Sequence, residues 1–312
     1  MSARKIVVLG TGGTIAGKAD EAWDNLGYTA AQLGVEALLA TIPATHGLGL
    51  VAEQVAQIDS KDMGYAVWRA LALRCTHWLA QDDVAGLVIT HGTDTLEETA
   101  YFLHAVLESH KPVVLTCAMR PASAVVPDGP QNLADAVALA ATPGARGVLA
   151  VCAGTVHGAL EVTKTHTYRL DAFSSGEAGP IGWIEEGSLR LVRNWPDVQA
   201  GRAQFAIEKI APADAWPRVE IVMNHAGADG SIVQALQARG VDGIVVAGTG
   251  NGTLSAGLQQ ALLQAMRDGV RVLRATRCAG GRVLPHGGDV LPDSRGLSPV
   301  KARIALLLDL LA

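Results

Sequence analysis

Short runs of apolar and β-branched residues recur along this chain and alternate with stretches of helical periodicity. Four runs in the first half lack the polar alternation of a half-exposed strand: residues 6–9, 86–90, 112–116 and 147–151. Such strands are buried on both faces, which is typical of a parallel sheet covered by helices. Helical patterns lie between them, at residues 66–79, 96–107 and 132–141. The alternation predicts an α/β fold with parallel strands joined by crossover helices.

The pattern changes after Gly182. Residues 183–184 and 189–191 flank Gly187 and predict a hairpin. Prolines and weak periodicity then mark a linker. Beyond it, strand-like and helical runs alternate again, at residues 219–223, 231–239, 243–247, 254–267, 270–275 and 300–311. We therefore predict three parts, which are an N-terminal domain, a linker and a smaller C-terminal α/β domain, over residues 1–193, 194–217 and 218–312.

Composition excludes several classes of protein. Of the 312 residues, 49% are hydrophobic and 18% are charged, and the net charge is −5. A disordered chain needs the opposite balance of hydrophobicity and charge. The sequence has no basic patch of the kind that indicates a nucleic-acid partner. No apolar run reaches the ~18 residues that a membrane span needs. The sequence predicts a folded protein with neither nucleic acid nor membrane as a partner.

The four cysteines, Cys75, Cys117, Cys152 and Cys278, are widely spaced. Without a CxxC pair, neither a zinc site nor a redox pair is expected, and buried thiols in a reducing compartment are the simpler interpretation. The N-terminus runs directly into an apolar strand, with no signal-peptide core or cleavage site before it. We expect a cytoplasmic protein, unless a signal has been removed.

Two turns rich in glycine and hydroxyl groups follow predicted strands, where ligands bind in open α/β sheets. The first, residues 11–17, has neither the GxGxxG spacing nor the lysine of a phosphate-binding loop. Its residues alone leave open a nucleotide loop, a structural turn, or a nucleophile such as Thr14 on a tight turn. In the second, residues 90–99, the hydroxyl and acidic groups exceed what one helix cap requires.

A third candidate is Lys164, which lies between two threonines in residues 163–167. This lysine could be an ordinary surface residue or, if buried, a base for a threonine hydroxyl. The histidines show no spacing typical of metal ligands, so no metal site is predicted.

Together these segments resemble the bacterial-type L-asparaginases of the asparaginase/glutaminase family. The similar segments follow the family's order and cover nearly the whole chain: residues 11–17, 91–103, 118–121, 128–133, 163–165 and 248–252. The resemblance implies a larger, flavodoxin-like N-terminal domain and a smaller C-terminal parallel-sheet domain. The implied reaction is hydrolysis of L-asparagine to L-aspartate and ammonia through a threonine acyl-enzyme. No metal or organic cofactor is expected.

The resemblance also implies a set of catalytic residues. Thr14 matches the primary nucleophile, and Tyr28 matches the tyrosine of a lid that closes over it. Thr93 matches the second catalytic threonine, and Lys164 matches the lysine that activates it. Asp94 would bind the α-ammonium group of the substrate. A threonine hydroxyl needs such a neighbour, because alone it is a weak nucleophile.

The substrate-binding residues are implied in the same way. Ser60, beside Asp59, matches the serine that binds the substrate α-carboxylate. Backbone N–H groups near Thr93 and Ala118 match the donors that stabilise the oxyanion. Donors fixed in advance suit a carbonyl that becomes tetrahedral during the reaction.

Three departures from the family pattern affect these expectations. Ser109 and His110 replace one half of a disulfide found in secreted members, which favours a cytoplasmic location. Thr253 stands where the family usually has asparagine or serine as a contact from a neighbouring subunit. No glutamate lies between residues 277 and 299 to orient the lid, and Asp289 is the nearest acid. Because aspartate is shorter, we expect a strong preference for asparagine, weak hydrolysis of glutamine and a relatively high Michaelis constant.

The resemblance implies a homotetramer, a dimer of intimate dimers in which each C-terminal domain completes a neighbouring subunit's site. Residues 248–253 and Asp289 have no evident role inside a lone subunit. Other functions remain open: a nucleotide-binding protein, an amidotransferase subunit that releases ammonia, a glutaminase-asparaginase of broad specificity, or a metabolite sensor. The amidotransferase subunit normally has a further N-terminal domain, and the sensor would not need Lys164 with two threonine motifs.

Overall fold

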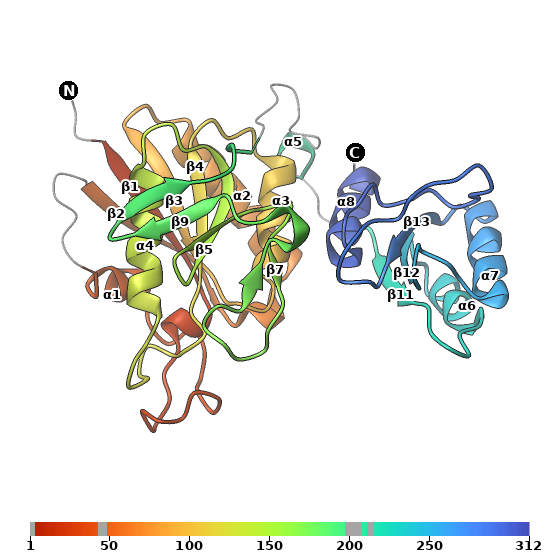
Figure 1. The fold of residues 1–312 in the computed structure, drawn as a ribbon, viewed down its shortest axis with the longest axis horizontal. Coiled ribbons are helices and arrows are strands. Elements are labelled where there is room, and N and C mark those ends of the chain that lie inside the picture. Colours follow the sequence, from red (N-terminus) through yellow and green to blue (C-terminus); the bar gives the residue numbers. More distant parts are fainter. Residues whose placement is uncertain (1–3, 43–48, 197–206, 211–214, 312) are drawn as a thin grey trace. The chain divides into compact units, whose positions relative to one another are not determined.

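The computed structural model describes residues 4–42, 49–196, 207–210 and 215–311. The chain divides into two compact units, Met1–Ile207 and Glu208–Ala312, and each is an α/β structure, as the sequence predicts (Figure 1). Much of the predicted linker lies outside the described residues. A short helix, α5 (Ile207–Ile210), lies within it.

An eight-stranded sheet forms the centre of the N-terminal unit, in the order β10-β9-β6-β5-β4-β3-β1-β2. Strands β1 to β5 are parallel, and β6, β9 and β10 are antiparallel. The order 2-1-3-4-5 is that of flavodoxin-like sheets. The strands are β1 (Lys5–Gly12), β2 (Gly49–Ile58), β3 (Val84–Thr90), β4 (Pro112–Thr116), β5 (Gly147–Cys152), β6 (Thr155–Gly158), β9 (Gly182–Glu185) and β10 (Ser188–Leu191).

The four strands predicted in this unit are confirmed as β1, β3, β4 and β5, and the predicted hairpin is β9–β10. Strand β6 was not predicted, and neither was β2. Strand β2 pairs only with β1 at the edge of the sheet, and most of its residues are partly exposed, so its sequence mixes polar and apolar residues instead of forming an apolar run. A two-stranded pair of β7 (Thr163–Lys164) and β8 (Phe173–Ser174) was also missed because each strand has only two residues.

Helices cover both faces of the large sheet. Helices α1 (Val35–Leu39) and α4 (Gly129–Ala141) share a hydrophobic core with alternate residues of the strands, such as Ile6 and Val8. The strand residues that alternate with these point to the opposite face of the sheet. On that face, α2 (Tyr65–Leu79) and α3 (Leu96–Val106) pack against the sheet and against each other. Helix α4 begins three residues earlier than predicted because Pro130 occupies its first turn, where a missing N–H costs nothing.

The C-terminal unit has a three-stranded parallel sheet, as predicted, with strands Val219–Met223 (β11), Gly243–Gly248 (β12) and Arg271–Thr276 (β13). Their order in the sheet is β11-β12-β13. Helices α6 (Ser231–Ala238) and α7 (Ala256–Arg267) pack on one face of the core. Helix α8 (Pro299–Leu311) contacts all three strands, and a Cβ at Gly243 would press on Leu306 of this helix. As the sequence indicates, Ser298 caps α8 by accepting from the N–H of Lys301 at 3.4 Å.

The order of the large sheet fixes where a ligand can bind. After β1 the chain crosses to one edge to form β2, and β3 returns to the other side of β1. Neighbouring connections therefore leave β1 and β3 in opposite directions, and ligands of open α/β sheets bind at the carboxyl ends of such a strand pair. Both threonine motifs follow these two strands, so the fold places them at the same point.

Candidate active site

Three turns lie in close contact at the carboxyl ends of β1, β2 and β3. A Cβ at Gly13, which has a φ of +83°, would overlap the backbone of Gly92, and a Cβ at Gly92 would overlap the side chain of Ser60. Glycine is therefore required at both positions by close approach, and at Gly13 by its positive φ as well. This contact brings Thr14, Thr93 and Ser60 into one site from three separate parts of the sequence.

Thr14 starts a 3₁₀ turn, Thr14–Ala16, directly after β1 and is only 7% exposed. Its Oγ1 lies 2.6 Å from the hydroxyl of Tyr28. The segment carrying Tyr28 is closed by two backbone hydrogen bonds between Lys18 and Thr29, and it is tied to the loop after β4 by the N–H of Ala19, which donates to Ser123 Oγ at 2.8 Å. The structure thus holds Tyr28 over Thr14 in a covered arrangement.

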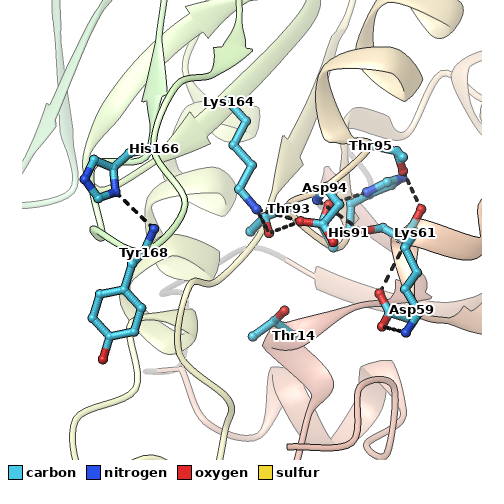
Figure 2. A network of polar contacts seen from close by, with 12 residues as sticks. Thr14, Asp59, Lys61, His91, Thr93, Asp94, Thr95, Lys164, His166 and Tyr168 are labelled. Carbon is cyan, nitrogen blue, oxygen red and sulfur yellow. Dashed lines mark hydrogen bonds and ion pairs between the residues drawn. The ribbon is translucent and has the colours of Figure 1, made fainter. Parts of the chain in front are cut away.

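Thr93 lies on the turn after β3, beside an ion pair. Lys164 Nζ donates to Thr93 Oγ1 at 2.8 Å and to Asp94 Oδ1 at 2.6 Å, as Figure 2 shows. The lysine side chain is 18% exposed, whereas that of Asp94 is 53% exposed. Lys164 is therefore not an ordinary surface residue. One amine contacts both a hydroxyl and a carboxylate, so a proton can pass among the three groups without movement of the backbone.

Ser60 and Asp59 follow β2 on a 3₁₀ turn, Ser60–Asp62, and Asp59 caps it. Ser60 is 2% exposed, and its Oγ accepts from the N–H of Asp94 at 3.2 Å. The carboxylate of Asp59 pairs with Lys61 Nζ at 2.7 Å. Ser60 thus connects the turn after β2 to the turn after β3. The carboxylate of Asp59 is instead paired within its own turn, with Lys61.

Ala118 lies on the turn after β4, which two side chains hold in place. Asp128 accepts from the N–H groups of Met119 and Arg120, both at 2.9 Å. Asn132 donates to the carbonyl of Cys117 at 2.9 Å. Neither Asp128 nor Asn132 was predicted to have a role, although both lie in the segment 128–133 that carries the resemblance. Their capture of the flanking groups leaves the N–H of Ala118 with no acceptor among the described residues.

Two further candidates, Thr253 and Asp289, lie in the C-terminal unit. Thr253 Oγ1 donates to the carbonyl of Thr249 at 3.0 Å. Asp289 pairs with Arg274 Nη2 at 2.7 Å and accepts from the N–H of His286 at 2.9 Å. These contacts hold the pKa of Asp289 below its usual range, the side chain of Arg274 being the larger cause. The side chains of both residues are thus engaged inside their own unit.

The cysteines are less isolated than their spacing indicates. Cys117 follows β4 and Cys152 is the last residue of the neighbouring strand β5, and their buried Sγ atoms lie 3.2 Å apart. The Cys152 thiol and burial raise the pKa of Cys117. Cys75 is also buried, whereas Cys278 is exposed. Among the described residues, no group of three or more His, Cys, Asp or Glu side chains is arranged to hold a metal ion, and no helix is long and apolar enough to span a membrane.

An α/β fold of this order, with Lys164 contacting a threonine and a carboxylate at the strand ends, is that of an amide hydrolase. The chain belongs to the asparaginase family. A model described as "Asparaginase, N-terminal" matches residues 5–197, and one described as "Glutaminase/Asparaginase C-terminal domain" matches residues 218–311.

Individual relatives agree with this assignment. The chain is 39% identical to "L-asparaginase 2" of Escherichia coli over 98% of its own length and 88% of the relative's. It is 38% identical to "L-asparaginase 2" of Bacillus subtilis, covering 98% and 82%. A solved structure described as "Crystal Structure of Probable Cytoplasmic L-asparaginase from Campylobacter jejuni" has a TM-score of 0.92 and 37% identity, covering 98% of this chain and 95% of that one.

Proposed function

We propose that this enzyme hydrolyses L-asparagine to L-aspartate and ammonia through an acyl-enzyme on Thr14. The observation that carries the proposal is the contact of Lys164 with both Thr93 and Asp94, on a turn that lies against the turn of Thr14. Two hydroxyls and a proton relay beside one crevice suit nucleophilic cleavage of an amide. The family assignment supports the same reaction.

In the proposed first step, Thr14 Oγ1 attacks the side-chain amide carbon, and its proton passes to the amide nitrogen. The bond between carbon and nitrogen breaks, ammonia leaves and an ester with Thr14 remains. Water then attacks the ester, the bond to Oγ1 breaks, and Thr14 recovers a proton as aspartate forms. Tyr28, at 2.6 Å from Thr14 Oγ1, and the chain from Thr93 through Lys164 to Asp94 move these protons.

The charges of the substrate match groups of the site. An amino acid carries an α-ammonium and an α-carboxylate, and each needs a partner when it leaves water. We assign the ammonium group to Asp94, whose carboxylate is half-exposed. We assign the α-carboxylate to Ser60, helped by the adjacent turn of Asp59. The N–H groups of Thr93 and Ala118 serve as oxyanion donors.

We also propose that the enzyme strongly prefers asparagine and hydrolyses glutamine only weakly. Its Michaelis constant for asparagine is relatively high. One methylene in a pocket changes discrimination by only about 1–3 kcal/mol, so contacts at the pocket wall decide it. Thr253 and Asp289, assigned to that wall from a neighbouring subunit, already have partners in their own unit. Reaching the lid or the substrate would require Asp289 to give up Arg274, which supports weak binding.

A glutaminase-asparaginase of broad specificity is the second candidate, because the C-terminal family model is described by both activities. Ammonia release from L-asparagine, L-glutamine and D-asparagine, measured for the parent and Thr14→Ala, tests both. We expect release from L-asparagine far above that from L-glutamine, and none from the variant. Comparable catalytic efficiency on the two L-amides would favour the broad enzyme, and ammonia release only with an added protein and tRNA would favour the amidotransferase.

We further propose a homotetramer, a dimer of intimate dimers, in which the C-terminal domain completes a neighbouring subunit's site, and a cytoplasmic location. Similarity to family members over both domains supports the assembly. Sedimentation under assay conditions tests it, and a fully active monomer would contradict it. Fractionation of the producing cell tests the location.

A further inference from the structure

A buried chain of side chains ends at the peptide that precedes Thr93. Trp68 Nε1 donates to Thr99 Oγ1 at 2.9 Å, Thr99 Oγ1 lies 2.9 Å from His91 Nε2, and His91 Nδ1 lies 2.7 Å from the carbonyl of Gly92. His91 and Thr99 are both 0% exposed. None of these three side chains has a role in the proposed reaction.

The donor and acceptor of every hydrogen bond in this series, from Trp68 to the Gly92 carbonyl, are fixed. The indole N–H of Trp68 can only donate, and the carbonyl of Gly92 can only accept. Burial lowers the pKa of His91 to about 4, so its ring is neutral near pH 7 and carries one proton. That proton must be on Nδ1, because only a donor can bond to the Gly92 carbonyl. Nε2 therefore accepts from Thr99, and His91 has a single tautomer.

The geometry of the next peptide links His91 to the reaction. In a trans peptide the C=O and the following N–H point in opposite directions, and no cis peptide occurs among the described residues. Because His91 holds the Gly92 oxygen on its own side, the N–H of Thr93 points away from the ring. That N–H has no acceptor within the described part of the chain. A donor bonded to the carbonyl also polarises the amide and strengthens its N–H.

We propose that His91 is a positioning residue, whose Nδ1–H fixes the Gly92 carbonyl and thereby presents the N–H of Thr93 to the oxyanion of the reacting amide. Trp68 and Thr99 select the tautomer that can do this. The inference rests on the proposed amide hydrolysis.

The test compares His91→Asn with His91→Leu, measuring kcat and KM for asparagine in the intact enzyme. The two side chains are similar in size, and the asparagine amide can donate to the Gly92 carbonyl from nearly the place of Nδ1, whereas leucine cannot. Loss of an oxyanion donor costs on the order of 10²–10³ in kcat. For a donor that is misplaced we expect His91→Leu to lose roughly 10–10² in kcat, with KM changed less than about threefold. His91→Asn should recover most of that loss.

Thr99→Val serves if His91→Leu does not fold, since it keeps His91 but removes the hydroxyl that selects the tautomer. It should lower kcat more than KM as well. Cys75→Ala, a buried position in the same unit with no place in this series of hydrogen bonds, is the control for lost stability and should keep the parent kcat. Equal losses in His91→Asn and His91→Leu, or a parent-like kcat in Thr99→Val, would overturn the proposal. A parent without amidase activity would instead contradict the proposed function.

Discussion

Each unit contains a lysine or arginine paired with an aspartate, and the two pairs differ in what surrounds them. Lys164 and Asp94 lie 2.6 Å apart on turns at strand ends, Asp94 is 53% exposed, and a threonine hydroxyl shares the amine. Arg274 and Asp289 lie 2.7 Å apart, and their side chains are only 11% and 14% exposed. In the proposed reaction the first pair binds the substrate and moves a proton. The second pair is closed, which suits a structural role in the C-terminal unit.

The largest expected effect concerns the two threonines near the open pair. Thr14→Ala and Thr93→Val should each reduce turnover by on the order of 10³-fold or more, because each removes a hydroxyl that the proposed reaction uses. Both residues lie on turns outside the sheet core, so thermal unfolding should change little. Steady-state ammonia release with a parallel unfolding curve measures both quantities. A variant that is folded and retains a tenth of the activity would remove that threonine from the mechanism.

Lys164→Met is expected to reduce kcat by roughly 10²-fold or more, the scale for removing a proton acceptor. Methionine keeps most of the aliphatic length of lysine but cannot contact Thr93 Oγ1 or Asp94 Oδ1. The matched control is Arg274→Met in the closed pair, which should lower stability. If the two variants changed kcat equally at a temperature where both are folded, the contrast between the pairs would fail.

Acid should destabilise the N-terminal unit before the C-terminal one. Burial lowers the pKa of both His91 and His157 to about 4, whereas an unfolded histidine titrates near 6.5. The neutral rings contribute stability that is complete above pH ~6.5 and is lost as the pH falls towards 4. Each histidine should cost about 2 kcal/mol at pH 5.

Hydrogen exchange of β3 and β12 at pH 7.5 and 5.0, corrected for intrinsic rates, measures this difference. His157→Gln should remove about half of the acid-induced loss in β3. Equal losses in the two strands would show that other groups dominate the acid response.

The smallest expected effect concerns Asp289. Because Arg274 lowers its pKa in the folded protein, its contribution to stability is present above pH ~3.9 and disappears as the pH falls through the lowered value. Asp289→Asn should therefore lower the thermal midpoint of the C-terminal unit at pH 7.5, and this effect should shrink as the pH is lowered below ~3.9. It should leave kcat for asparagine near that of the parent if the carboxylate is purely structural. A rise in KM would instead support its proposed contact with a neighbouring subunit's lid.

The sequence by itself determined the fold class, four parallel strands of the large sheet, the C-terminal parallel sheet and the hairpin, because apolar runs and helical periodicity report burial directly. It could not indicate β2, whose edge position leaves it half-exposed, or β7 and β8, which are too short for a pattern. The residues proposed as catalytic could be selected only by resemblance to a family. Composition and spacing alone left Lys164 with a surface role as an alternative.

Only the tertiary structure decided which of these residues meet. Lys164 is 71 residues from Thr93, and the contact between the turns of Gly13 and Gly92 joins parts of the chain that no local pattern connects. The tautomer of His91 and the ion pair between Arg274 and Asp289 likewise cannot be predicted from the sequence. Strand periodicity is set by burial of neighbouring residues along the chain, whereas a site depends on strand order, which brings distant turns to one end of a sheet.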